Sequence, residues 1–289
     1  MTTGLREPLP SARKIAATKP TGTPIRLSVM ATATGITGAP QVFDGAQAAA
    51  DAINAQGGIP DAAGGKSHPL EIVECRVEGS ASTSAPQVAL KCATDAVSEG
   101  VVADAGKYLF AQLAIEEFQK QSVPLIGTFL VDATDITNPD VFALGGGAVM
   151  ELPGTALALE KAGAKTIGFV SADNPAGRAL PGFIKPVLGD ATLTIEEYLP
   201  LDPSADISSS VSKLVQENPD GIVLGQTASV SVKLTQALRS AGYQGMIGFS
   251  GANLNKDTIK QLGKFTTDIV SASNYPATTQ TSNKQIKQF

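Results

Sequence analysis

Residues 43–59 read FDGAQAAADAINAQGGI and carry the clearest helix signal in the chain. Alanine has the highest helix propensity and recurs along the segment, and the pair of glycines near its end is the residue type that most often terminates a helix. Ile59 is placed to pack back onto the last helical turn. An apolar run over 25–30 precedes the segment, with a polar loop of glycine and threonine over 31–40 between them. Together these residues predict a β-strand followed by an alanine-rich helix.

The composition predicts a globular protein with two lobes. The chain has 289 residues, of which 43% are hydrophobic and 17% charged, and this length is long for one compact core. Tryptophan is absent and aromatic residues make up 5%, so we expect a core of Ala, Val, Ile and Leu. The net charge of −5 argues against nucleic acid as a partner, because phosphate binding needs a basic surface. No apolar stretch approaches the roughly 18 residues of a membrane span.

Strand and helix signals alternate along nearly the whole chain, which predicts an α/β fold with mainly parallel sheets covered on both faces. Two series of five strands are expected, at 25–30, 70–75, 100–105, 123–127 and 141–144, and at 166–171, 193–199, 220–225, 245–249 and 267–273. Two series of similar length predict two Rossmann-like doubly wound lobes. The glycines at 145–147 lie between them and are interpreted as a flexible crossover, because a dinucleotide loop would need a third glycine where Met150 stands.

The residues that could carry chemistry are few. His68 is the only histidine and lies in a loop, and one histidine with two cysteines cannot build the usual zinc sites or a Ser-His-Asp relay. No nucleophile elbow and no Walker glycine loop is present. The acidic pair at 116–117 is interpreted as a solvated helix face. These observations favour a binding protein without metal or cofactor over an enzyme.

The pattern F-D-G-A-x-x-A-x-x-x-I-N-x-x-G-G-I after a first β-strand resembles the first helix of periplasmic binding proteins of the leucine/isoleucine/valine type. These are the substrate-binding subunits of ABC importers for amino acids and amides. The resemblance implies the type I periplasmic-binding fold, in which two lobes close about a hinge on a small polar ligand. It also implies an ABC permease as partner, a monomer, no cofactor and no chemistry.

The same resemblance assigns the parts of the chain. Residues 24–145 would form the N-terminal lobe and 146–275 the C-terminal lobe, which ends in a "SNYP" run that carries 276–289 back to the first lobe. Residues 1–23 are expected to be a disordered tail, because they are basic and proline-containing and lack the apolar region of a signal peptide. An extracytoplasmic location, with a removed signal or lipoprotein signal outside this chain, is implied. The resemblance stops before the family's C-terminal portion. We therefore expect either a truncated molecule or a part of the protein that this sequence does not represent, and a missing portion would expose apolar surface on the first lobe.

The two cysteines, Cys75 and Cys92, lie on a predicted strand and on the helix after it, roughly 85–98. Such neighbours could meet in a disulfide that stabilises the fold by about 3 kcal/mol in the chain-entropy model, or they could be two buried free thiols. The resemblance favours the disulfide, because family members carry such a pair and an exported protein occupies an oxidising compartment.

The ligand is expected beyond the carboxyl ends of the strands, where open α/β sheets form their crevice and helix amides point at the cleft. The candidate residues in the first-lobe loops are Thr37, Lys107, Tyr108, Thr128 and Phe129. Those in the second-lobe loops are Asp173, Asn174, Gln226, Thr227, Ala252 and Asn253.

These loops depart from the amino-acid-binding members of the family. The loop at 107–109 lacks the serines that hold a ligand carboxylate, and the loop at 250–253 lacks the acidic residue that balances a ligand ammonium. Lys107 either pairs with an anion or points to solvent, and Asp173 either replaces the missing acid or serves as a turn residue. A carboxylate, an amide or a neutral polar solute therefore fits at least as well as an α-amino acid.

Three functions follow from these residues. The first is the solute-binding subunit of an ABC importer. The alternative is a ligand-sensing receptor or regulator on the same fold, although no helix-turn-helix precedes the first strand to make it a repressor. The third is a Rossmann-type enzyme, which tight nucleotide binding would support.

Overall fold

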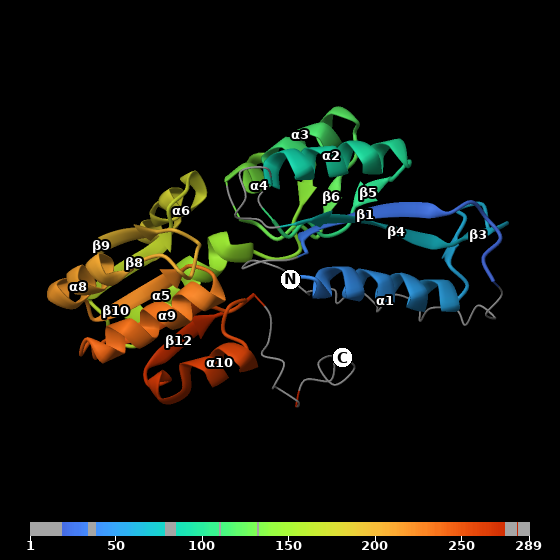
Figure 1. Cartoon of the computed structure of the whole chain (residues 1–289). Helices are drawn as coiled ribbons and strands as arrows, with labels where there is room; N and C mark the ends of the chain where they lie inside the picture. Colours follow the sequence, from blue (N-terminus) through green and yellow to red (C-terminus); the bar gives the residue numbers. More distant parts are fainter. Residues whose placement is uncertain are drawn as a thin grey trace, which may run out of the picture.

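The computed structural model describes residues 19–33, 39–78, 85–109, 111–131, 133–274 and 282. It contains two α/β lobes, each built on a five-stranded sheet in which all neighbouring strands run parallel (Figure 1). The predicted fold class is therefore confirmed.

The first sheet has the strand order β4-β1-β5-β6-β7. The first strand of the chain, β1, lies inside the sheet next to its edge strand β4, and the later strands are added on the other side of β1, so the sheet is doubly wound. Its strands are β1 (Ile25–Thr32), β4 (Leu70–Val77), β5 (Ala103–Asp104), β6 (Leu125–Ile126) and β7 (Val141–Phe142). A separate antiparallel hairpin, β2 (Ile59–Pro60) with β3 (Ser67–His68), pairs Ile59 with His68.

Helix α1 (Gln41–Ala55) is the helix predicted from the opening segment. It ends as expected, because Gly57 and Gly58 have φ of 104° and 77°, a conformation that glycine adopts without strain. Asn54 then fixes the helix to the sheet: its side-chain amide donates to the Leu70 carbonyl over 2.8 Å and accepts from the Leu70 N–H over 2.7 Å. The segment therefore positions the first βα unit.

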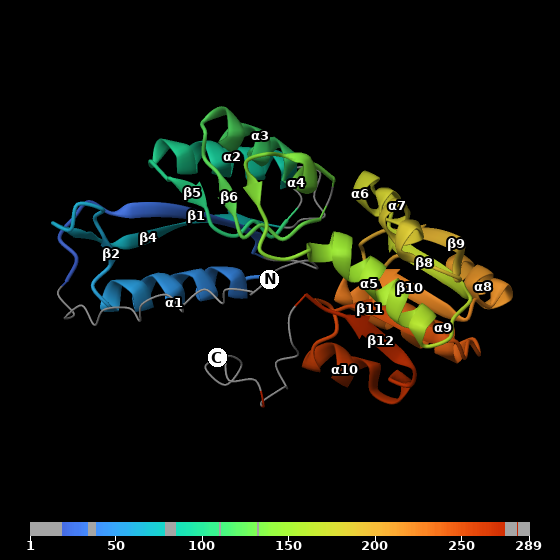
Figure 2. The ribbon, with the colours of Figure 1, turned by 180° about the vertical axis from the view of Figure 1, so that it is seen from behind.

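Helices cover the two faces of the first sheet unequally (Figures 1 and 2). Helix α1 packs on one face, mainly against β1 and β4. The opposite face is covered by α2 (Ala85–Ser98) and α3 (Gln112–Lys120), and α4 (Ala133–Thr137) follows β6. A disulfide joins Cys75 on β4 to Cys92 on α2, with their Cα atoms 5.5 Å apart, so the expected pairing is confirmed.

The second sheet repeats the winding of the first, with the order β12-β11-β10-β8-β9. Its first strand again lies inside the sheet, its second on one side and its last three on the other. The strands are β8 (Thr166–Ala172), β9 (Thr192–Leu199), β10 (Gly221–Gly225), β11 (Met246–Ser250) and β12 (Ile269–Ala272).

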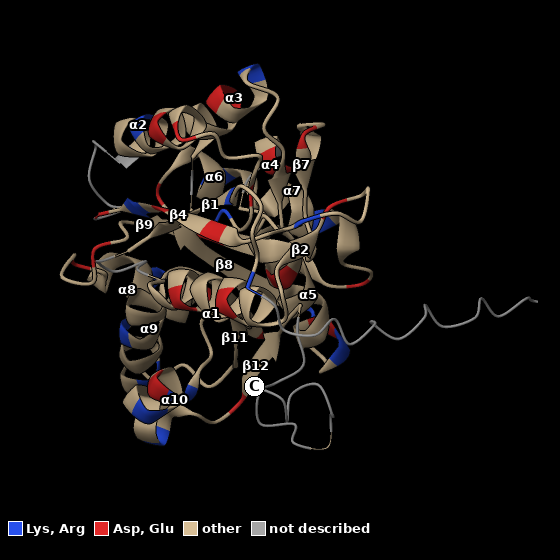
Figure 3. Cartoon of the chain, turned by 90° about the vertical axis from the view of Figure 1, so that its right-hand side faces the viewer, with Lys and Arg blue, Asp and Glu red and all other residues tan. Residues whose placement is uncertain are grey.

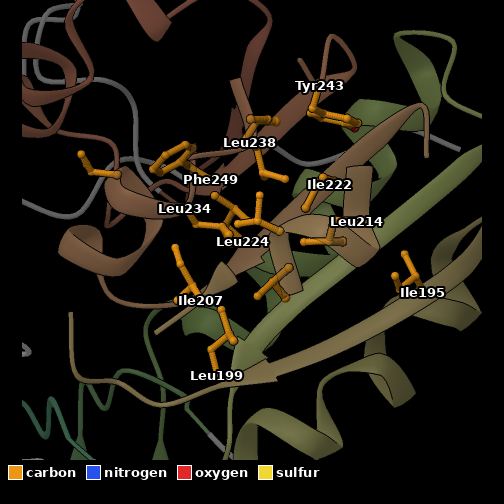
Figure 4. Close-up of a cluster of buried hydrophobic side chains, with 14 of the residues drawn as sticks. Ile195, Leu199, Ile207, Leu214, Ile222, Leu224, Leu234, Leu238, Tyr243 and Phe249 are labelled. Carbon is orange, nitrogen blue, oxygen red and sulfur yellow. The ribbon is translucent and has the colours of Figure 1, made fainter. Parts of the chain in front are cut away.

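Both faces of the second sheet carry helices. Helix α5 (Gly147–Lys161) lies along β10, β11 and β12 on one face, while α8 (Ser208–Glu217) and α9 (Ala228–Ser240) cover the other (Figure 2). Figure 4 shows the core beneath α8 and α9, where Leu224, Leu234 and Phe249 are fully buried. Tyr243 is buried at its margin and donates its hydroxyl to the Pro219 carbonyl over 2.8 Å. The remaining elements are α6 (Pro175–Ala179), α7 (Pro181–Ile184), α10 (Lys256–Leu262) and two 3-10 turns at Lys185–Val187 and Gly263–Phe265.

The chain passes between the sheets at the glycines interpreted as a crossover. Gly147 has a φ of 56°, and a Cβ on it would lie 2.1 Å from the Leu130 carbonyl oxygen, so only glycine fits there. Asn274, which follows β12, accepts from the Gly146 N–H over 3.1 Å and donates to the Gly147 carbonyl over 3.3 Å. The segment that enters the second lobe is therefore bonded to the segment that follows the last strand of that lobe. Residues 1–18 and 276–289 other than Ser282 lie outside the described residues, and the predicted lobe boundaries stay predictions.

Candidate functional site

A cleft of about 1030 Å³ lies between the two lobes. Its first-lobe wall comes from the loops that follow β5 and β6, and its second-lobe wall from the loops that follow β11 and β12 together with α5 and α10. The cleft therefore occupies the carboxyl ends of strands in both sheets, where the sequence analysis expected it. The lining residues are Val42, Gly106, Lys107, Tyr108, Gly127, Thr128, Phe129, Gly145, Glu151, Gly251, Ala252, Leu254, Asn255, Lys256, Asp257, Ile259, Ser271 and Ser273.

An aromatic pair forms part of the first-lobe wall. The rings of Tyr108 and Phe129 have centroids 4.6 Å apart at an interplanar angle of 40°. Backbone bonds fix both residues, because the Tyr108 N–H donates to the Met30 carbonyl over 2.8 Å and the Phe129 N–H donates to the Lys107 carbonyl over 2.9 Å. The pair is half-buried and presents a rigid apolar surface to the cleft.

Thr128 lies between these aromatic residues in the chain and also lines the cleft. It is 2% exposed, and its hydroxyl has no hydrogen-bond partner in the described part of the protein. A buried hydroxyl without a partner is costly, so it is well placed to bond to a bound solute.

The charge of Lys107 is already neutralised within the protein. Its ammonium lies 2.8 Å from a carboxylate oxygen of Asp135 on α4 and donates to the Leu109 carbonyl over 2.8 Å, and both charged side chains are fully buried. The Lys107 ammonium therefore does not point to solvent, and it is not a free cation for an anionic ligand. Its ion pair connects α4 to the first-lobe wall of the cleft.

Asp104 lies below the same wall, at the end of β5, and is fully buried. Burial raises its pKa to about 7, while the Ser28 hydroxyl that donates to it over 2.9 Å and the nearby Lys107 act in the opposite direction. Three buried ionisable side chains, Asp104, Lys107 and Asp135, therefore lie in or behind the first-lobe wall.

The second-lobe wall contains a carboxylate that the sequence analysis did not single out. Glu151 lies in the second turn of α5, lines the cleft and is 3% exposed. One of its oxygens accepts from the Ala252 N–H over 3.2 Å, and the other accepts from the Asn274 side-chain amide over 2.9 Å. Glu151 therefore connects the loop after β11, the crossover and the cleft.

Of the second-lobe candidates, Ala252 lines the cleft and Asn253 lies beside it, donating its side-chain amide to the Gln226 carbonyl over 2.7 Å. The others lie at the carboxyl ends of β8 and β10, away from the cleft, where their side chains have structural partners. Gln226 is buried and donates to the carbonyls of β8 and β9, and Thr227 caps α9.

The loop after β8 is also held by its own contacts. Asn174 caps α6 by accepting from the Gly177 N–H over 2.7 Å, and Asp173 forms an exposed ion pair with Arg178 at 2.6 Å. Asp173 is thus occupied as a local partner in this structure. Thr37 lies outside the described residues.

Helix α10 carries charged residues of both signs (Figure 3), and its first residues line the cleft. Lys256 and Asp257 are exposed neighbours in its first turn. In the described residues, no group of three or more His, Cys, Asp or Glu side chains is placed to hold a metal ion. Within that same part of the chain, no helix has the length and apolar character needed to cross a membrane.

Comparison with known proteins relates this architecture to one family. A family model described as periplasmic binding protein matches residues 24–289. No curated protein matches the sequence significantly.

Solved structures share the fold at low sequence identity. A substrate-binding periplasmic protein from Ralstonia solanacearum has a TM-score of 0.71 and 17% identity, covering 92% of this chain and 74% of its own. A solute-binding protein of an ABC transporter from Rhodopseudomonas palustris BisB5, in complex with 3,4-dihydroxybenzoic acid, has a TM-score of 0.69 and 17% identity, covering 92% and 72%. A leucine-binding protein from Thermotoga maritima has a TM-score of 0.64 and 18% identity, covering 83% and 67%. At these identities the likeness shows the fold alone.

Proposed function

Because this chain belongs to the periplasmic binding protein family and has its type I two-lobed fold, we propose that it is the extracytoplasmic solute-binding subunit of an ABC importer. It captures a small polar ligand, such as an amino acid, an amide or a small carboxylate, between its lobes. The closed form then presents a joint surface to a membrane permease. The protein acts as a monomer and performs no chemistry.

The observation that carries this proposal is the cleft itself. Its walls come from the carboxyl ends of strands in two separate parallel sheets. Its volume of about 1030 Å³ lies just above the range of roughly 300–1,000 Å³ that small-molecule sites occupy. A ligand that contacts both walls stabilises the closed arrangement of the lobes, because those contacts exist together only when the lobes approach.

The residues proposed to contact the ligand first are Tyr108, Thr128, Phe129 and Ala252, which line the cleft with available surface or backbone groups. Lys107 is proposed to help shape the wall around the ligand, and its charge does not bind the ligand because it is paired with Asp135. We propose that lobe closure brings in the remaining candidates: Thr37, Asp173, Asn174, Gln226, Thr227 and Asn253.

The hinge of this closure is proposed to lie where the crossovers meet. The backbone there includes Gly145, Gly146 and Gly147, and Asn274, which precedes the predicted second crossover, bonds to this segment. Small residues at such a point absorb the backbone rotation of a hinge.

The proposal is tested by a thermal-shift screen of amino acids, amides, aromatic acids and ureas. A ligand present at about 100 times its dissociation constant stabilises the folded protein by about 2.7 kcal/mol, and we expect a rise in melting temperature on the order of 5 °C. X-ray scattering should show a smaller radius of gyration with that ligand.

Two variants make the screen specific. Phe129→Ala should weaken binding, whereas Lys213→Ala, which changes an ion pair on α8 away from the cleft, should leave it unchanged. Tight binding of a nucleotide, with no response to any of these solutes, would contradict the proposal.

A further inference from the structure

Resting on the proposed function, we infer that Glu151 accepts the positively charged amino group of the ligand. The cleft then selects small solutes that carry an amine beside an aromatic or apolar body. An acidic residue is absent from the loop at 250–253, and Glu151 supplies the negative charge from α5.

The first support is the charge state of the contacts that Glu151 makes. Its oxygens accept from the Ala252 N–H and from the backbone and side-chain N–H groups of Asn274, which are all neutral donors. No Lys or Arg among the described residues forms an ion pair with it. Its negative charge is therefore hydrogen-bonded but not neutralised.

The second support is the balance of charge along the cleft. Lys107 is paired with the buried Asp135, and Lys256 and Asp257 are exposed neighbours of opposite sign. Among the described residues that line the cleft, Glu151 is thus the buried charged side chain that has no oppositely charged side chain beside it. At 3% exposure it is poorly screened by water, so a ligand cation is attracted and a ligand carboxylate repelled more strongly than at the surface.

The third support comes from the opposite wall. The faces of Tyr108 and Phe129 attract cations as well as apolar groups. The buried hydroxyl of Thr128, without a partner in the described part of the chain, can bond to a polar group of the same ligand. Because these three residues belong to the first lobe and Glu151 to the second, one amine-bearing ligand can bridge the two.

The position of Glu151 also relates binding to closure. The same carboxylate that would hold the amine accepts from Asn274, which bonds to Gly146 and Gly147 at the crossover. A ligand at Glu151 therefore contacts the proposed hinge through a single side chain.

The test compares matched ligands by isothermal titration calorimetry on the full chain. Tyramine is compared with tyrosol, in which a hydroxyl replaces the amino group, and L-leucine with 2-hydroxy-4-methylpentanoate. Any other solute found in the thermal-shift screen is compared with its own analogue without the amine. We expect the amine-bearing member of a binding pair to bind at least about thirtyfold more tightly.

A charge-neutral variant then assigns the preference to Glu151. Glu151→Gln keeps the shape and one acceptor, and we expect it to reduce the preference for the amine to less than about threefold. Asp257→Asn, which removes an exposed carboxylate from the same cleft, should keep the preference. The melting temperature of each variant checks folding, and the ligand pairs on the unmodified protein decide the matter if Glu151→Gln does not fold.

Two results would overturn the inference while leaving the proposed function intact. One is equal or tighter binding of solutes without an amine, such as 4-hydroxybenzoate, to the unmodified protein. The other is an amine preference that persists in folded Glu151→Gln. A chain that binds no solute of the wider screen contradicts the proposed function itself, and the inference with it.

Discussion

The two lobes wind their sheets in the same order but cover them differently. In the second lobe, helices lie on both faces of the sheet, and its strands have four to eight residues. In the first lobe, β5, β6 and β7 have two residues each, and α1 packs on its face mainly against β1 and β4. Among the described residues, the same topology therefore produces a second sheet with helices on both faces and a first sheet with one face only partly covered by a helix.

The part of the first sheet that no described helix covers is marked by the alternation of side chains along two short strands. Leu125 on β6 and Val141 on β7 pack into the first-lobe core, whereas the next residues, Ile126 and Phe142, point to the other face and are 44% and 54% exposed. Leu144, two residues further on, is 81% exposed. Exposed apolar residues that cluster in this way are expected to loosen the lobe.

The largest expected effect comes from one substitution made in both lobes. Phe249 is fully buried and Phe142 is half-exposed. Phe249→Ala should lower the free energy of unfolding by about 3–5 kcal/mol, through lost burial and a new cavity, and Phe142→Ala should change it by less than about 1 kcal/mol. Urea unfolding followed by circular dichroism measures both. Equal losses would mean that Phe142 is covered in solution, and the contrast between the lobes would fail.

The disulfide should stabilise one lobe and not the other. Cys75 and Cys92 lie 17 residues apart within the first lobe, so replacing both with alanine should cost about 3 kcal/mol through the added freedom of the unfolded chain. Hydrogen exchange read by mass spectrometry should show faster exchange in peptides of β4, α2 and α3, with the second lobe unchanged. An equal loss of protection in both lobes would show that they unfold as one unit.

The buried carboxylate of the first lobe should make that lobe sensitive to pH. Burial raises the pKa of Asp104 from 3.8 to about 7, so the folded protein holds this proton more tightly than the unfolded chain. The stabilisation is complete below about pH 4 and is lost as the pH rises to about 7.

The matching variant is Asp104→Asn, which stays neutral and can still accept from Ser28. Between pH 5 and pH 8 the unmodified protein should lose about 2–3 kcal/mol relative to this variant, at 1.36 kcal/mol for each pH unit of the titration. Asp95→Asn, at an exposed ion pair with Lys91, should run parallel to the unmodified protein. Parallel pH curves for Asp104→Asn as well would show that Asp104 is ionised throughout.

The sequence predicted the arrangement of strands well, because the inner strands of the second sheet, such as β8, β10 and β11, are nearly continuous apolar runs with clear ends. All ten expected strands occur in the two sheets, and those of the second lobe agree to within about two residues at each end. The hairpin at 59–68 was missed, since each of its strands has two residues and is too short to show a period.

The candidate site was predicted only where position along a strand determines it. Open α/β sheets bind ligands beyond the carboxyl ends of their strands. This principle predicted the positions of four residues that line the cleft: Tyr108, Thr128, Phe129 and Ala252. It could not find Glu151, which lies inside a helix. The carboxylate of Glu151 gains its importance from Asn274, 123 residues later in the chain, and such long-range partners leave no local pattern.

The smallest expected effect concerns how helices begin. In the second lobe, Asn174, Thr227 and Asn255 cap α6, α9 and α10 with their side chains, whereas the other N-cap residues of that lobe, before α5, α7 and α8, form no such bond. In the first lobe, the N-cap residues of α1 and α3, Pro40 and Ala111, form none either. Asn255 accepts from the N–H groups of Asp257 and Thr258 over 3.0 and 2.9 Å. Asn255→Ala should therefore cost about 1 kcal/mol in unfolding free energy, and Asn255→Ser should recover most of it.

The readout for this cap is hydrogen exchange in α10, with the peptides of α1 as an internal reference. Faster exchange confined to 256–262 would show that the cap stabilises α10 locally, in addition to the packing of helices on both faces of the second sheet. Thr258 and Leu262 of α10 are buried, and their packing also stabilises the helix. If Asn255→Ala leaves exchange in α10 unchanged, the cap adds nothing to this packing. The difference in stability between the lobes is then due to packing alone.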